Sequence, residues 1–298
     1  MDTGTLRLEQ TKQDGKAFLV VTGTTVTVRD LVIPEAWEGM PVCAIGAHAF
    51  AGNAEVRFVS LPESITSIGA FAFHNCKALQ RMEVYDSVTD YGDGAIRQCT
   101  ALSDVQFTVR QKSFEAVTRM LSDCDNTLTF SFSLPDGNAR LTFPGFVYDF
   151  TENTMARTIQ FNIEGSGMAF RECVSRAGID FTAYDRLFSR AKLDNISVIT
   201  QVVLNRLAYP YALSEQARAV YGSYLQENAG QILNVLVRQQ DTGRIRFLVT
   251  QHQALLQKEA LDEATTLASA KGLVEITALL TDCAASLQPS ASHGRLSI

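Results

Sequence analysis

The chain has 298 residues, of which 46% are hydrophobic and 19% are charged. This is an ordinary composition for a globular protein with enough apolar material for a core, and the length indicates roughly two domains. The formal net charge of −6 and the pI near 5.3 exclude a general nucleic-acid binder, because such proteins present a basic face.

We find no targeting signal in the sequence. The N-terminus lacks a basic segment followed by an apolar stretch, and no apolar run approaches the roughly 18 residues of a membrane span. We therefore expect a cytoplasmic protein without membrane insertion, which would be extracellular only if a leader has been removed. The six cysteines form no CxxC pair, so zinc and dithiol redox motifs are absent.

A repeat with a period of 23 residues dominates the first third of the chain. The string IGAHAF at residues 45–50 returns as IGAFAF at 68–73 and fades into YGDGAI at 91–96. A fixed period of this size is typical of a solenoid, in which each repeat buries its apolar face only by stacking on its neighbours. We therefore predict stacked coils in this region.

Apolar residues recur at this interval in four columns with the alternate spacing of β-strands, so we predict that they face the interior. The columns are Val56, Leu79 and Leu102; Val59, Met82 and Val105; Leu61, Val84 and Phe107; and Ile65 with Val88. Phe50, Phe73 and Ile96 recur on the other limb of the coil, where we expect them to fill its middle.

Two further columns hold small residues. Gly46, Gly69 and Gly92 recur at one turn, where we expect a tight or positive-φ backbone. Cys76 and Cys99 share a column, and coils stacked about 4.8 Å apart would bring their Cα atoms within disulfide reach. In a cytoplasmic protein we expect them to remain buried thiols.

The pattern Ile-Pro … Gly-x-Pro-Val-x-x-Ile-Gly-x-x-Ala-Phe resembles the BspA-type leucine-rich repeat of bacteria. This chain carries it at Ile33, Pro34, Gly39, Pro41, Val42, Ile45, Gly46, Ala49 and Phe50. The resemblance covers about residues 18–107. In the third repeat Tyr91 replaces Ile and Ile96 replaces Phe, so we expect this repeat to close the solenoid. The resemblance implies recognition of proteins or surfaces and not catalysis.

The residues that alternate with the buried columns are predicted to point outward, and they form our candidate protein-binding face. They are Phe58, Ser60, Arg81, Glu83, Asp104 and Gln106. They comprise an aromatic ring and charges of both signs, which does not identify a ligand. An ordinary solvated sheet face would also explain them, because exposed strand faces are normally polar.

Residues 112–165 lose the repeat and are interpreted as a β-rich connecting unit. Helical spacing at 113–124 is followed by phenylalanines that alternate with Thr and Ser, which predicts a small antiparallel unit. Asp123 and Asp125 fall in a predicted turn, where solvation explains their carboxylates.

Residues 166–298 have helical patterns, including a second repeat. The stretch 232–249 aligns with 263–280 at an offset of 31, and each copy reads as helix, tight turn and helix. Residues 267–280 resemble the helical part of an ankyrin repeat. The string EATT at 263–266 replaces that family's Thr-Pro-Leu-His box, so we expect ankyrin-like helical packing without its β-hairpins.

Together these patterns predict an α+β protein with three parts: a leucine-rich-repeat solenoid with an N-terminal cap at 1–111, the β-rich unit at 112–165, and a helical repeat domain at 166–298. We find no catalytic, metal-binding or cofactor-binding motif, and the four histidines fall at unrelated positions. The expected function is non-enzymatic protein–protein interaction through repeat surfaces, with an unknown partner and no nucleic acid.

Two alternatives stay open. One is an enzyme or small-ligand binder with a site at the junction of the middle and helical regions, near Tyr148, Tyr184, Asp185 and Arg186, because domain junctions commonly hold pockets. The other is a cell-surface adhesin, which requires that a leader has been removed.

Overall fold

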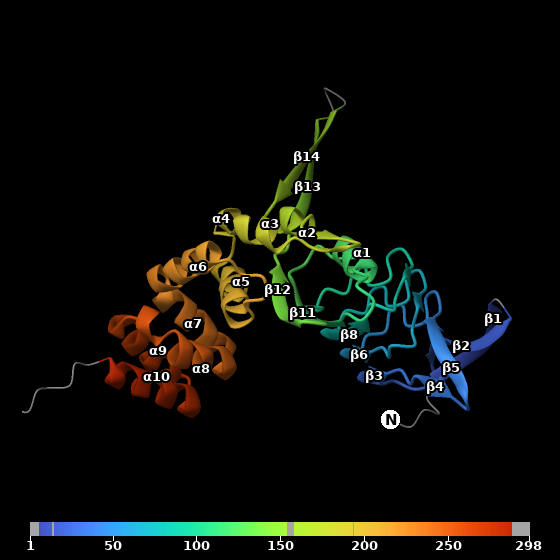
Figure 1. The fold of residues 1–298 in the computed structure, drawn as a ribbon, viewed down its shortest axis with the longest axis horizontal. Coiled ribbons are helices and arrows are strands. Elements are labelled where there is room, and N and C mark those ends of the chain that lie inside the picture. The colour runs from blue at the N-terminus through green and yellow to red at the C-terminus, as the bar shows by residue number, and fades with distance from the viewer. Residues whose placement is uncertain (1–5, 14, 154–157, 193, 288–298) are drawn as a thin grey trace, which may run out of the picture. The chain divides into compact units, whose positions relative to one another are not determined.

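The computed structural model describes residues 6–13, 15–153, 158–192 and 194–287, with only the backbone described between 148 and 163. The chain divides into two compact units. The first comprises Met1–Asp194 and Tyr209–Leu213, and the second comprises Asn195–Ala208 and Ser214–Ile298. The expected α+β class is confirmed, since strands dominate the first unit and helices build the second (Figure 1).

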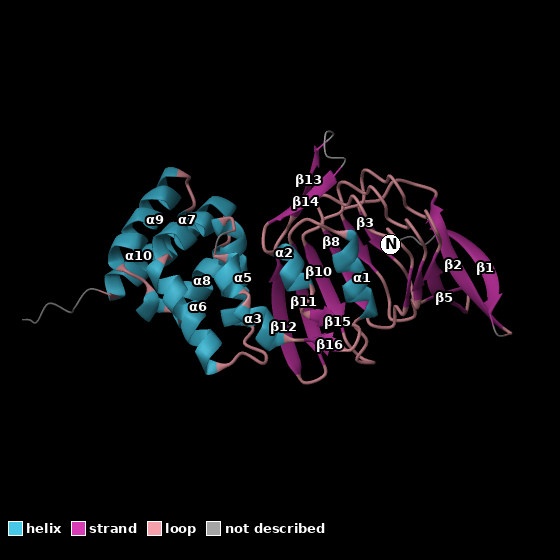
Figure 2. Ribbon diagram, turned by 90° about the horizontal axis from the view of Figure 1, so that it is seen from above, coloured by secondary structure: helices cyan, strands magenta, loops and turns pink. Residues whose placement is uncertain are grey.

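The main sheet of the first unit has the strand order β12-β11-β10-β8-β6-β3 (Figure 2). Its strands are β3 (Asp30–Val32), β6 (Phe58–Ser60), β8 (Arg81–Tyr85), β10 (Asp104–Thr108), β11 (Leu128–Leu134) and β12 (Gly137–Phe143). All neighbours are parallel except β11 and β12, which form an antiparallel hairpin. One parallel strand per coil is the arrangement that stacked repeats of equal length produce.

Each coil returns through a second limb, which carries a second sheet. Its strands are β1 (Leu6–Gln13), β2 (Lys16–Thr24), β4 (Ala36–Trp37), β5 (Met40–Ile45), β7 (Ser67–Ile68) and β9 (Asp90–Tyr91). Strands β2, β5, β7 and β9 run parallel in this order, whereas β1 pairs antiparallel with β2 and β4 with β5. The β1–β2 hairpin therefore begins the stack on this limb.

The register of the main sheet equals the period of the sequence. Val59 pairs with Met82, and Met82 pairs with Val105, so residues 23 apart are direct neighbours. Every residue of the four predicted columns is at most 1% exposed. On the other limb the rings of Phe50 and Phe73 stack with their centroids 5.1 Å apart. The predicted interior of the coils is confirmed.

The recurring glycines allow close stacking of the coils. None of Gly46, Gly69 and Gly92 has a positive φ, so that part of the expectation is wrong. A Cβ on Gly69 would lie 2.8 Å from Ala47 Cα, and one on Gly92 would lie 2.7 Å from Ala70 Cα. These separations are shorter than real Cβ atoms tolerate, so the close approach of neighbouring backbones requires glycine at these two positions.

The sheet continues past the third repeat, where we expected the solenoid to close. β11 pairs in parallel with β10, and Phe130 lies beside Val105, at an offset of 25 residues instead of 23. Helix α1 (Glu115–Asp123) occupies the connection between the two strands. The expected antiparallel unit is present as the β11–β12 hairpin, within the same sheet as the coils. As domain boundaries, residues 111 and 165 stay a prediction.

Asp123 completes the last coil of the second limb. In the coil before it, the N–H groups of Phe71 and Phe73 donate to backbone carbonyls of the next coil. The corresponding N–H groups of Gly94 and Ile96 donate to the Asp123 carboxylate, at 3.1 and 3.3 Å. The expectation that solvation explains Asp123 is wrong, because its side chain is only 6% exposed. Burial raises the pKa of this carboxyl, against the opposing effect of the hydrogen bonds.

The rest of the first unit consists of short elements. They are the hairpin β13 (Val147–Asn153) and β14 (Thr158–Glu164), α2 (Gly167–Arg171), the hairpin β15 (Val174–Ser175) and β16 (Gly178–Ile179), α3 (Phe181–Arg186) and α4 (Phe188–Ala191). Arg171 connects this part to the last coil. Its guanidinium donates to the carbonyls of Leu121, Cys124, Asn126, Pro144 and Gly167. Burial lowers the pKa of Arg171 to about 10, so it stays charged near neutral pH.

The cysteine column forms a line of free thiols. Cys76 Sγ donates to Phe50 O and Cys99 Sγ donates to Phe73 O, each at 3.1 Å, and both residues are buried. The hydrogen bond with Cys76 and burial raise the pKa of the Cys99 thiol. The expectation of buried thiols is confirmed.

The second unit is a stack of helical hairpins. Its elements are α5 (Ile196–Ala208), α6 (Glu215–Glu227), α7 (Ala229–Gln239), α8 (Thr242–Gln251), the short 3-10 helix η2 (Gln253–Leu255), α9 (Lys258–Ala270) and α10 (Val274–Ser286). α7 packs on α9 and α8 packs on α10, so the two copies of the second repeat lie against each other.

Buried residues in the second unit recur at the predicted offset of 31. Between the hairpins α7–α8 and α9–α10, the residue pairs that share this offset and are both buried are Ala229 and Ala260, Leu233 and Ala264, Val237 and Ala268, Ile245 and Ile276, and Val249 and Leu280. Because the same positions of each hairpin face the interior, the expected helical hairpin repeats are confirmed.

We predict that Gly69→Ala destabilises the first unit by about 3 kcal/mol, the upper end of the usual cost of overpacking. Gly52→Ala is the control, because Gly52 has a positive φ but open space around it and should cost only about 1–2 kcal/mol. Urea unfolding followed by fluorescence of Trp37, the single tryptophan, reports on this unit. Equal losses for both variants would contradict the role of close stacking.

We also predict that Asp123→Ala lowers the free energy of unfolding of the first unit by about 3 kcal/mol, because two buried N–H groups lose their acceptor. Asp125→Ala changes an exposed neighbour and should stay within about 0.5 kcal/mol of the wild type. The same Trp37 fluorescence measurement applies. A loss below 1 kcal/mol for Asp123→Ala would show that the carboxylate does not complete the coil.

Candidate functional site

The outer face of the main sheet carries all six residues of the predicted protein-binding face. One row across the strands contains Phe58, Arg81 and Asp104, and the next contains Ser60, Glu83 and Gln106. All six are exposed or half-buried, whereas the residues between them on each strand are buried. The alternation of the strands therefore places them on one surface, and their role in binding stays a prediction.

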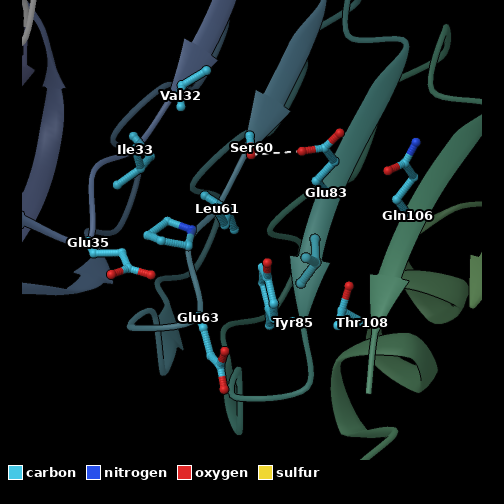
Figure 3. A pocket seen from close by; sticks show the side chains of 12 residues that line it. Val32, Ile33, Glu35, Ser60, Leu61, Glu63, Glu83, Tyr85, Gln106 and Thr108 are labelled. Atoms are coloured by element: carbon cyan, nitrogen blue, oxygen red, sulfur yellow. Dashed lines mark hydrogen bonds between the residues drawn. The ribbon is translucent and has the colours of Figure 1, made fainter. Parts of the chain in front are cut away.

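One part of this surface is an acidic hollow with a volume of about 330 Å³. Glu35, Glu63 and Glu83 border it, and none of its described lining residues is basic. Figure 3 shows Glu83 beside Ser60 in one row of the sheet and Tyr85 in the row below. Ser60 Oγ donates to Glu83 Oε2 at 2.9 Å, which orients that carboxylate on the strand. We call this hollow the glutamate hollow.

A second hollow of about 600 Å³ lies towards the beginning of the strands. Arg57, Arg81 and Arg140 border it, together with Asp30 and Asp104. Gln106 lines both hollows, so they adjoin on the same face. We call this one the arginine hollow.

Two contacts hold the guanidinium groups of the arginine hollow in place. Arg81 lies over the ring of Phe58, with its Cζ 4.7 Å from the ring centroid, a cation–π contact that orients the charge. Arg140 Nη2 donates to Asp104 Oδ1 at 3.0 Å. Within the described part of the chain, neither Arg57 nor Arg81 forms an ion pair. These two charges are therefore available to a ligand.

Sequence reasoning missed part of this surface. Arg140 and Ser131 come from β12 and β11, which we had placed outside the solenoid. The alternation of phenylalanines in β11 was the available signal, but its offset of 25 hid the register. Tyr85 continues the outward alternation of Arg81 and Glu83, so it could have been included.

The alternative site at the junction of the middle and helical regions stays a prediction, and helix α3 carries three of its four residues. Tyr184 is fully buried, and its hydroxyl donates to Thr142 O at 2.6 Å and accepts from Thr142 N at 3.1 Å. Asp185 is half-buried and Arg186 is exposed. The side chain of Tyr148 lies outside the described residues. Tyr184 therefore binds the backbone of β12, a structural role.

The described residues contain neither a cluster of metal ligands nor a helix that could span a membrane. No three His, Cys, Asp or Glu side chains among them come together as a metal site requires. Every helix in that part of the chain is too short or too polar to cross a bilayer.

Comparison with known proteins identifies the repeat. Residues 39–139 match the family model described as BspA type leucine rich repeat region (6 copies). The resemblance expected from the sequence is thereby confirmed for the leucine-rich repeats, and the match extends beyond residue 107 into β12. No curated protein matches the chain. The ankyrin-like part stays a prediction.

Solved structures with similar repeats come from several bacteria. A leucine rich cell surface protein from Faecalibacterium prausnitzii A2-165 is 23% identical with a TM-score of 0.29, covering 37% of this chain and 36% of that chain. A leucine-rich repeat protein from Bacteroides capillosus is 25% identical with a TM-score of 0.29, covering 36% and 80%. The Leucine Rich Repeat protein of T. pallidum is 21% identical with a TM-score of 0.25, covering 36% and 70%.

We predict that Tyr184→Phe destabilises the first unit by about 1–3 kcal/mol, because it removes two hydrogen bonds from a buried site. Tyr85→Phe on the outer face is the matched control, for which the change should stay within about 0.5 kcal/mol. Urea unfolding followed by Trp37 fluorescence measures both. A Tyr184→Phe protein as stable as the wild type would contradict this structural role.

Proposed function

We propose that the chain is a non-enzymatic protein–protein interaction module and that the outer face of the main sheet is its recognition surface. One observation carries the proposal: the two adjoining hollows on this face are bordered by charged side chains that form no ion pairs among the described residues, such as Arg57, Arg81, Glu35 and Glu63. Charged side chains that serve only solubility have no need to gather around two hollows on one face of the protein.

The architecture favours binding over catalysis. Leucine-rich repeats present an extended open surface, whereas small-molecule sites are concave and bury most of their ligand. Proteins that contain such repeats generally act in protein–protein interaction, and no enzymatic activity is indicated for this chain. The outer face also offers an aromatic ring and an arginine in contact, Phe58 and Arg81, residue types that dominate binding energy at interfaces.

The helical unit adds a second repeat surface to the proposal. Its hairpins α7–α8 and α9–α10 stack as copies, and we propose that this packing is ankyrin-like. Whether a partner contacts the coils or the helices is decided by the experiment below. A cytoplasmic location stays part of the proposal, which cell fractionation would check.

We predict that a Phe58→Ala, Arg81→Ala double variant of the full chain loses its partners. Each protein is immobilised and exposed to a lysate of cells that carry the gene, and captured proteins are quantified by mass spectrometry. Proteins captured by the wild type should fall by about tenfold or more, since truncation of a hot-spot residue costs about 2 kcal/mol or more.

Lys77→Ala is the control, because Lys77 is exposed but borders neither hollow. It should capture the same proteins as the wild type, and both variants should keep the Trp37 fluorescence of the folded unit. Undiminished capture by the double variant would show that recognition lies elsewhere, with the helical unit as the next candidate.

A further inference from the structure

We propose that the outer face recognises a dipolar peptide segment, with an acidic side chain in the arginine hollow and a basic side chain in the glutamate hollow. This inference rests on the proposed function and specifies the chemistry of the partner at that surface. It follows from the separation of positive and negative charge between the two hollows. This separation is visible only when several residues of the face are considered together.

The arginine hollow suits one carboxylate of a partner. Asp104 already pairs with Arg140 at 3.0 Å, which leaves Arg57 and Arg81 against the single carboxylate of Asp30 on its border. The guanidinium of Arg81 is held over Phe58, so its planar fork is ordered before a ligand arrives. Arginine presents donors in a geometry that matches a carboxylate bidentately.

The glutamate hollow suits one cationic side chain. Glu35, Glu63 and Glu83 border it without a basic residue among the described lining, and Glu83 is oriented by Ser60. Tyr85 lies between Glu83 and Glu63 (Figure 3). Three carboxylates around a hollow of about 330 Å³ attract a Lys or Arg side chain, and an aromatic ring adds a surface for its apolar stem or its charge.

The two hollows are separated along the strand direction. Arg81 and Glu83 both point outward from β8 and lie two residues apart, so their backbones are about 7 Å apart at the rise of a β-strand. Arg57 precedes β6, whereas Glu63 follows it. A bound extended segment therefore carries its two charges about two to four residues apart. Its direction along the strands sets which charge comes first.

The same charges disfavour partners of a single sign. A polyanion that contacts Arg57 and Arg81 would also face the carboxylates of the adjoining hollow, and like charges brought together at an interface weaken binding. The chain's net charge of −6 adds to this repulsion. A polycation would likewise be repelled by the arginines of the arginine hollow. A protein segment that carries both a positive and a negative side chain can pair with the charges of both hollows.

The test is selection of peptides displayed on phage, with the full wild-type chain as bait. Enriched peptides should carry an acidic and a basic residue about two to four positions apart, in one preferred order. A synthetic peptide of the enriched sequence is then measured by fluorescence anisotropy against the wild type and against the charge-swapped variant Arg81→Glu, Glu83→Arg. The swap should weaken binding by about tenfold or more, as expected for reversed contacts at an interface.

A peptide with its two charges exchanged provides the decisive control. It should bind the swapped variant better than the wild type, which loss of folding cannot produce. Lys77→Ala should bind the original peptide like the wild type. Raising the salt concentration should weaken binding, because these charges are accessible to solvent.

The outcomes separate this inference from the proposed function. Peptides that bind the face, and lose affinity in the Phe58→Ala, Arg81→Ala variant, but lack the paired charges would overturn the dipolar inference alone. Equal or tighter binding of a polyglutamate probe would do the same. Peptides indifferent to that double variant, or no enrichment from the library, would count against the proposed function and with it this inference.

Discussion

The first unit depends on how closely its coils approach one another. Gly69 and Gly92 each lie against the backbone of the preceding coil, with no room for a Cβ, and donate to Ile45 O and Ile68 O at 2.8 and 2.7 Å. This spacing lets one column of side chains pack on the next, and every apolar column is buried between the two limbs of the coils. Burial here comes from neighbours in the stack, and a coil that lost its neighbour would expose its interior.

A stack built in this way needs an ending, because its last coil leaves backbone donors without acceptors. Two side chains provide it. Asp123 accepts the N–H groups of Gly94 and Ile96 in place of a further coil, and Arg171 donates to five carbonyls around the end of α1. The Asp123 carboxylate, which the sequence presented as a solvated charge, thus takes the place of the backbone carbonyls of a further coil. On the main sheet, the antiparallel β12 ends the parallel series.

The sequence predicted the structural elements that repeat at a constant period, and it missed those whose spacing changes. The four apolar columns and the two outward rows, which begin at Phe58 and Ser60, follow from the offset of 23, and the buried columns of the helices follow from the offset of 31. The sequence did not predict that β11 belongs to this sheet, because helix α1 changes the offset to 25. Arg140 on β12 was missed for the same reason. The role of Asp123 could not be foreseen, since it depends on a contact with a segment 27 to 29 residues away.

The same regularity that builds the core arranges the outer face. Parallel strands in register convert positions 23 residues apart into neighbours, so Arg57 and Arg81, remote in the chain, border one hollow. Side chains at the beginnings of the parallel strands therefore gather at the arginine hollow, and those nearer their ends gather at the glutamate hollow. Arg140 of the antiparallel β12 joins the first group. In an antiparallel sheet the beginning of one strand would lie beside the end of its neighbour, and the two groups of side chains would mix. The separation of charge on this surface is thus a consequence of parallel stacking, and a partner that binds the whole face needs the complementary separation of charge.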